Sequence, residues 1–227
     1  MPNLDFAIEG ASAVSFAASP LLSFRLKIHN TNFEEKIQSI SLRCQIQIEP
    51  TKRRYNSNEQ SHLFELFGEP ERWGQTLRPM LWTHTSATVP PFQGETIVEL
   101  PVPCTFDFNI AAATKYFAGL EDGFVPLLLM FSGTVFFESE NLGLQIEQIS
   151  WDKEAPFKLP ISIWREMMDH YYPNTAWLCL RRDVFERLAR YKMENAIPTW
   201  DQTLETIIPA PAKQADKELA IEGGLPS

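Results

Sequence analysis

Aromatic and arginine side chains gather towards the C-terminal end of the chain, near an expected helix-to-loop junction. Tyrosine, tryptophan and arginine are the residue types most enriched at the energetic centres of protein–protein interfaces. Their clustering therefore predicts a partner-binding surface. The alternative, that the same rings close the junction between helices and sheet, stays open because aromatic side chains bury area efficiently. The residues of the predicted surface are Tyr171, Tyr172, Trp177, Arg181, Arg182 and Trp200.

Residues suited to metal or catalytic chemistry form no recognisable pattern. His62 and Glu65 are three apart, but carboxylate-bridged di-metal sites place the glutamate first and use two such motifs. Cys179 could in principle act as a nucleophile with His170 as its base. It alternates with leucines in an apolar run, however, which favours packing as a small hydrophobe. The glycines form no phosphate-binding loop. We therefore expect no catalytic residue, no metal ligand and no cofactor.

The charge balance argues against a nucleic-acid partner. The 227 residues include 20 Lys and Arg against 29 Asp and Glu, a formal net charge of −9. Nucleic-acid binding normally needs a basic excess, because phosphate neutralisation supplies much of the affinity. The dense basic cluster Lys52-Arg53-Arg54 stands between a strand-like run and a polar loop, which is typical of solvated turn residues.

Targeting and redox signals indicate a cytoplasmic protein. The N-terminus lacks the basic start and apolar run of a signal peptide. The longest apolar stretch, 124–137, is interrupted by proline and glycine and is shorter than the about 20 residues of a membrane-spanning helix. We expect no membrane insertion. Three cysteines far apart in the chain predict reduced thiols rather than disulfides or a zinc site: Cys44, Cys104 and Cys179.

Alternation of apolar and polar residues predicts antiparallel strands with one buried face through the first two thirds of the chain. The continuous apolar run 127–131 predicts a central strand that is covered on both faces. A helix is expected between Phe108 and Val125, with Asn109 as its cap. The expected strands are 4–8, 22–28, 40–48, 81–89, 95–102, 105–108, 125–137 and 142–149.

From Pro160 the apolar period becomes helical. Helices are expected at 161–171, from Asp183 and from Thr199. Asp183 is expected to cap the second of these helices, with Glu186 at the reciprocal position of a capping box. Glu186 is also four residues from Arg190, a spacing that favours an ion pair.

The predicted fold class is α+β, mainly β: an antiparallel β-sandwich-like core with a C-terminal helical extension. The sandwich domain is expected to span 1–159, with a helical or loop insertion at about 50–79. The helical extension at 160–208 is expected to pack on it. Residues 209–227 are rich in Pro, Ala, Lys, Glu and Gly, a composition that predicts a disordered tail.

The C-terminal third carries a more specific resemblance. The run Ala-Trp-Leu-Cys-Leu-Arg-Arg-Asp at 176–183, followed by Phe185 and by Ile-Pro-Thr-Trp-Asp at 197–201, resembles the signature of a bacterial protein family of unknown function. Proteins of that family are sometimes encoded near uptake nickel–iron hydrogenases. The resemblance implies a helper in the maturation or assembly of a metalloenzyme, and it transfers no catalytic residues.

These observations favour a non-catalytic protein-binding accessory or assembly factor with a protein partner. Two other classes stay open. A small-molecule or carbohydrate-binding module would need a deep apolar pocket ringed by Trp82 and polar groups. An enzyme of unfamiliar type would need ionisable groups that converge in one cleft.

Overall fold

The computed structural model describes residues 1–33, 35–104, 108–139, 143–175 and 178–208, and only the backbone of residues 108–113. The chain forms two compact units, Met1–Ala176 and Trp177–Ser227. Among the described residues, no helix is long and apolar enough to cross a membrane.

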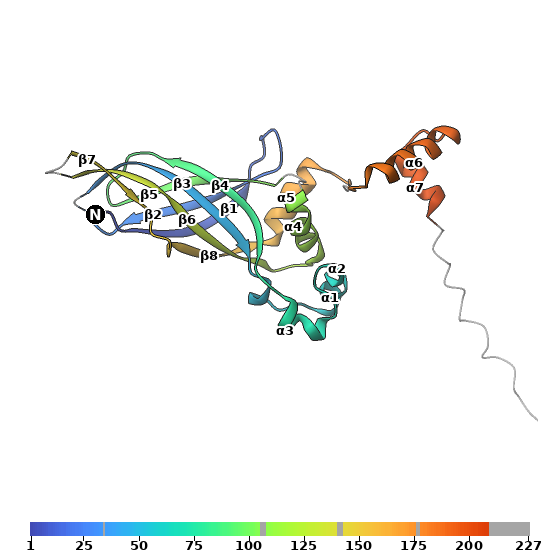
Figure 1. Ribbon diagram of the computed structural model, residues 1–227, viewed down its shortest axis with the longest axis horizontal. Coiled ribbons are helices and arrows are strands. Elements are labelled where there is room, and N and C mark those ends of the chain that lie inside the picture. Colours follow the sequence, from blue (N-terminus) through green and yellow to red (C-terminus); the bar gives the residue numbers. More distant parts are fainter. Residues whose placement is uncertain (34, 105–107, 140–142, 176–177, 209–227) are drawn as a thin grey trace, which may run out of the picture. The chain divides into compact units, whose positions relative to one another are not determined.

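The first unit is a sandwich of two antiparallel sheets (Figure 1). One sheet has the strand order β1-β2-β5, and the other has the order β4-β3-β6-β7 with β8 also paired to β6. The alternation of apolar and polar residues gives each sheet one apolar face, and the apolar faces of the two sheets pack against each other. The bounds are β1 Leu4–Ala13, β2 Leu21–Asn30, β3 Lys36–Ile48, β4 Met80–Val89, β5 Glu95–Pro103, β6 Phe124–Ser139, β7 Gly143–Gln148 and β8 Glu154–Pro160.

The predicted fold class is confirmed, with corrections at two places in the first unit. The strand β8 was not predicted, because its sequence contains two prolines and lacks a clean alternation. Phe108 begins the helix α4 (Phe108–Gly119) instead of ending a strand, and Asn109 therefore lies inside the helix rather than at its cap. The rest of the predicted strand, 105–107, lies outside the described residues.

Side chains from both sheets meet in one hydrophobic core. Phe6 of β1 stacks on Phe131 of β6, with ring centroids 4.4 Å apart, which joins the two sheets. At Gly133 of β6 the backbone has φ +143, and a Cβ there would lie 2.1 Å from the carbonyl oxygen of Ser41 on β3. Only glycine permits this close approach of the two central strands.

Helices gather at one end of the sandwich (Figure 1). α4 and α5 (Ile161–Tyr171) attach there through a chain of rings. Phe117 of α4 lies 5.0 Å from Trp82 of β4 and 5.1 Å from Trp164 of α5, between ring centroids. The insertion between β3 and β4 forms short helices: η1 Pro50–Lys52, α1 Ser57–His62, α2 Phe64–Phe67, η2 Pro70–Arg72 and α3 Trp73–Thr76.

The described part of the second unit, 178–208, contains two helices, α6 (Arg182–Glu194) and α7 (Trp200–Ile207). The helix expected from Thr199 is α7, and Thr199 caps it by accepting a hydrogen bond from the backbone N–H of Gln202 at 3.2 Å. The predicted cap of α6 is wrong, because the N-cap is Arg181, two residues earlier, and Asp183 lies in the first turn. Glu186 pairs with Arg182 at 3.0 Å, not with Arg190.

The predicted helical extension at 160–208 is divided between the two units: α5 belongs to the first, and α6 and α7 belong to the second. The predicted disordered tail, 209–227, lies outside the described residues.

Candidate functional site

A buried ion pair within the insertion contacts the segment that precedes β6. Arg53 and Glu59 are 7% and 2% exposed and lie 2.5 Å apart, from a guanidinium nitrogen to a carboxylate oxygen. Glu59 completes a capping box with Asn56 at the start of α1. The same carboxylate accepts a hydrogen bond from the backbone N–H of Glu121 at 3.0 Å. The carboxylate of Glu59 therefore accepts hydrogen bonds from backbone N–H groups at the start of α1 and at Glu121, which are far apart in the sequence.

A pair of tyrosines extends this network. The hydroxyls of Tyr55 and Tyr116 lie 2.7 Å apart, and Tyr55 also donates to the carbonyl oxygen of Pro50 at 2.7 Å. Burial raises the pKa of Tyr116 to about 12 and raises that of Tyr55 further above its ordinary value. Both hydroxyls therefore stay protonated as donors at neutral pH, which suits a structural role.

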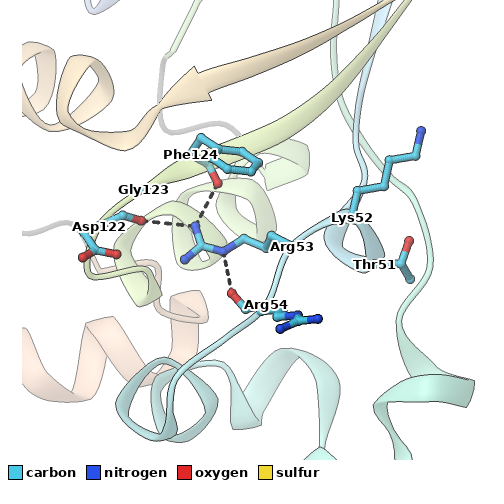
Figure 2. A pocket seen from close by; sticks show the side chains of 7 residues that line it. All are labelled: Thr51, Lys52, Arg53, Arg54, Asp122, Gly123 and Phe124. Carbon is cyan, nitrogen blue, oxygen red and sulfur yellow. Dashed lines mark hydrogen bonds between the residues drawn. The ribbon is translucent and has the colours of Figure 1, made fainter.

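A depression of about 560 Å³ lies beside the basic cluster (Figure 2). Figure 2 shows the guanidinium of Arg53 donating to the backbone carbonyls of Asp122 and Phe124, at 3.3 and 2.8 Å. Lys52 pairs with Glu49 at 2.7 Å. Arg54 is exposed, and no ion pair is found for it in the part of the chain that the structure describes. Of the three basic side chains beside the depression, Arg54 is therefore the one that is available to bind an anion. One exposed arginine is not enough to form an anion-binding site.

The interpretation of the basic cluster as solvated turn residues is therefore wrong for Arg53. Lys52 and Arg54 are exposed as expected. The side chain of Arg53 is buried because three carbonyl groups and one carboxylate replace water around its guanidinium.

A second depression, of about 610 Å³, lies along α5. Its rim carries the carboxylates of Glu121, Asp122, Glu166 and Asp169. Arg165 donates to the backbone carbonyls of Leu120 and Glu121 and so fixes α5 to this loop. No group of three or more metal-binding side chains occurs among the described residues.

The thiols divide between the two units. Cys44 and Cys104 are buried in the sandwich, and burial raises the pKa of each to about 12. Cys179 is exposed. The interpretation of Cys179 as a packed hydrophobe is therefore wrong, because the two-helix unit offers little interior in which to bury it.

The second unit presents an aromatic cluster on its surface. Phe185 of α6 and Trp200 of α7 lie 5.4 Å apart between ring centroids, and they are 47% and 40% exposed. The ammonium of Lys192 lies 5.6 Å from the Trp200 ring centroid, within cation–π range. Met193 is exposed as well. Phe185 and Met193, eight residues apart, share a face of α6. We call Phe185, Lys192, Met193 and Trp200 the aromatic cluster.

The predicted surface residues fall into both units. Tyr171 is half-buried at the end of α5, where its hydroxyl contacts the carbonyls of Val14 and Ala17 at 2.8 and 3.0 Å. It therefore anchors the β1–β2 turn. Tyr172 follows α5 and is half-buried. Trp177 lies outside the described residues.

The other predicted residues lie in the second unit. Arg181 and Arg182 are exposed and pair with Asp183 and Glu186 at 3.1 and 3.0 Å. Trp200 belongs to the aromatic cluster.

Sequence reasoning missed the other members of the aromatic cluster. Phe185, Ala189 and Met193 follow a four-residue spacing, which marks a second apolar stripe beside the one formed by Val184, Leu188 and Tyr191. That four-residue spacing could have identified these members of the aromatic cluster from the sequence. Trp82, the residue around which a ligand pocket was considered, is instead buried in the core against Phe117.

Solved structures share only a general likeness with the chain. The CARDB domain of a Pyrococcus furiosus protein, solved in complex with di-metal ions, is 10% identical, with 70% of this chain and 92% of that chain covered and a TM-score of 0.26. β-Glucosidase 3B from Thermotoga neapolitana, solved with α-D-glucose, is 13% identical, with 69% and 17% covered and a TM-score of 0.24. No curated protein matches the chain.

A family model matches residues 1–216, which include the sandwich, the insertion and both helices of the second unit. The sandwich and the helical unit therefore occur together in one family. The chain belongs to a family of unknown function, DUF6084.

Proposed function

We propose that this protein is a non-catalytic protein-binding accessory factor whose second unit docks on a partner. The observation that carries the proposal is the exposure of the aromatic cluster. Of residues 178–208, only Thr203 is buried. Two short helices with so small an interior bury too little apolar area to offset the conformational entropy that is lost when they fold. A surface that covers the apolar face of α6 and α7 would supply the missing burial.

The charges on α6 define the chemistry of that partner. Arg181 and α6 together, residues 181–194, contain five Lys and Arg against three acids. Two of these acids, Asp183 and Glu186, are already paired with Arg181 and Arg182. Arg187 and Arg190 are exposed, and within the described ranges no ion pair is found for either. The fitting partner has an apolar groove rimmed by carboxylates, which receives the amphipathic helix.

The biological setting of the proposal comes from the sequence resemblance. The C-terminal signature is similar to that of bacterial proteins encoded near nickel–iron hydrogenases. Within the proposal the partner therefore belongs to the assembly of a metalloenzyme of that type in the bacterial cytoplasm. Hydrogenase subunits or maturation proteins among the bound partners would support this setting.

Affinity capture of the tagged full-length protein from native cell lysate, with quantitative mass spectrometry, tests the proposal. The variant Phe185→Ala/Trp200→Ala removes the aromatic cluster. Trp151→Ala is the matched control, since Trp151 is exposed on the sandwich. We expect a stoichiometric partner that the control retains and the double variant loses by roughly thirtyfold, the size of a hot-spot contribution of about 2 kcal/mol. Equal capture by the double variant, or recovery of the bait alone, would overturn the proposal.

Charge reversal tests the chemistry of the groove. Arg187→Glu/Arg190→Glu is expected to weaken the same partner and to reduce the salt dependence of binding, because the carboxylate rim would then face acids. Arg72→Glu, an exposed arginine of the insertion, is the control. Binding unaffected by reversal at 187 and 190 would exclude an acidic rim.

A further inference from the structure

Strand β7 has reversed polarity. Its apolar side chains Leu144 and Ile146 are 62% and 63% exposed. Glu147 lies opposite the buried Val135 of β6 and therefore shares its inward face, where one carboxylate oxygen is buried. An antiparallel strand with one wet face ordinarily turns its polar side chains outward. The exposed apolar side chains of β7 therefore indicate a surface that another molecule buries.

The outer edge of β7 is open to pairing. Among the described residues, β7 pairs with β6 alone. The backbone N–H of Ile149 donates to the carbonyl of Gly133 on β6 at 2.9 Å. Because hydrogen-bonded and non-hydrogen-bonded pairs alternate along an antiparallel ladder, Leu144 and Ile146 point their backbone N–H and C=O groups away from β6.

The strand has one of the usual protections of an edge, an inward charge, and lacks the others. Natural edge strands carry proline, lysine, a bulge or an inward charge to block further pairing. Between Gly143 and Gln148 there is neither proline nor lysine, and the β6–β7 register is continuous. Glu147 is the single charged residue, and it turns inward. Glu147 points away from the outer edge, where the carbonyl of Leu144 accepts a local hydrogen bond from Nε2 of Gln145 at 3.0 Å. This contact is exposed, and a paired strand could replace it.

We infer that β7 pairs antiparallel with β7 of a second copy, so that two sandwiches share one continuous sheet. A two-fold axis at Gln145 sets Leu144 of each chain against Ile146 of the other. Both residues then present their outward N–H and C=O groups to each other, and their apolar side chains pack on one face. Glu147 lies opposite Gly143 of the second copy, so no like charges face each other. A register centred on Ile146 would instead set Leu144 against Gln148.

This homodimer is independent of the proposed docking of the second unit, and its test is the oligomeric state. Sedimentation velocity of the full chain over a concentration series is expected to show a dimer for the native sequence and a monomer for Ile146→Lys. Ile97→Lys, at an exposed isoleucine of β5, is the matched control and stays dimeric. A native chain that is monomeric, including one that binds a different protein along β7, overturns the inference. A dimer that survives Ile146→Lys also overturns it.

A disulfide tests the register. Non-hydrogen-bonded antiparallel pairs bring Cα atoms to about 4.5 Å, within the range that a disulfide bridges. Gln145→Cys in a Cys179→Ser background is therefore expected to cross-link two chains on mild oxidation, and Gln148→Cys is not. Failure of Gln145→Cys to cross-link excludes the two-fold axis at Gln145.

Discussion

The end of the sandwich and the helical unit both combine aromatic rings with basic side chains, and they use them in opposite ways. At the sandwich end, Arg53 lies 5.2 Å from the Tyr55 ring centroid and is buried among a carboxylate and three carbonyls. In the helical unit, Lys192 lies over Trp200, whose ring remains exposed. The same residue types therefore hold one unit together and remain available for binding in the other.

This comparison shows that saturation of contacts, rather than residue type, distinguishes a structural cluster from a binding surface. In the network around Arg53, every polar group considered has a partner within the protein. In the aromatic cluster, the apolar area is left for another surface. Substitutions in the two regions should therefore differ in what they damage: stability in the first and binding in the second.

The largest contrast is expected between two tryptophans. Trp164 is buried and stacked on Phe117. Trp164→Ala should lower the free energy of unfolding by about 3–5 kcal/mol, the usual cost of removing a buried large aromatic side chain. Trp200→Ala should lower it by less than about 1 kcal/mol, because the ring is partly exposed. Urea unfolding followed by circular dichroism measures both, and equal losses would abolish the distinction between the regions.

The next contrast lies within the insertion. Glu59→Ala leaves Arg53 as a buried charge without its carboxylate and should cost about 3–5 kcal/mol, at the lower end because the carbonyls remain. Glu65→Ala removes the partner of Lys115 in an exposed pair 2.6 Å long, and should cost less than about 1 kcal/mol. Thermal unfolding of the two variants compares them. A Glu59→Ala protein as stable as Glu65→Ala would show that the buried pair does not stabilise the insertion.

Thiol reactivity sharpens the comparison without a mutation. Cys179 should react with a chromogenic thiol reagent at pH 8 in the native protein, because it is exposed. Cys44 and Cys104 should react only after unfolding, since burial blocks access and raises the pKa of each thiol to about 12. A stoichiometry above one thiol in the native state would contradict the packing of the sandwich.

The smallest effect is expected in acid. Asn56 and Asn58 of the insertion donate to Glu121 at 2.8 and 3.0 Å, and these hydrogen bonds lower the pKa of Glu121 below its ordinary value of 4.5. A lowered folded-state pKa adds stability above pH 4.5, and this stability is lost as the pH falls through the folded value. The urea midpoint should therefore drop less between pH 5 and pH 3 in Glu121→Gln than in the native chain.

The sequence predicted most of the fold because its strands follow a clean period of two. Leu22 to Ile28 and Ile40 to Ile48 alternate without error, and both lie in the sandwich. The prediction missed β8, where prolines at 156 and 160 obscure the pattern. It also missed the capping box at Asn56 and Glu59, although the spacing of an asparagine followed three residues later by a glutamate is visible in the sequence.

The candidate site was predictable only in part. Trp200 and the two arginines were selected for their residue types, and they lie on the second unit. Tyr171 was selected for the same reason, yet its hydroxyl anchors a turn. Arg53 looked like a surface residue and is buried. These assignments depend on which backbone groups the fold brings near each side chain, and local sequence does not encode that.

Site-specific photo-cross-linking in the native cell tests the docking role of the helical unit most directly. A photoreactive amino acid at Met193 would stand at the edge of the aromatic cluster, and the same group at Trp151 would stand on the exposed surface of the sandwich. The account predicts a discrete cross-linked partner from position 193, lost when Trp200→Ala is added, and no such partner from position 151. The absence of an adduct at 193, or the same adduct from both positions, would contradict it.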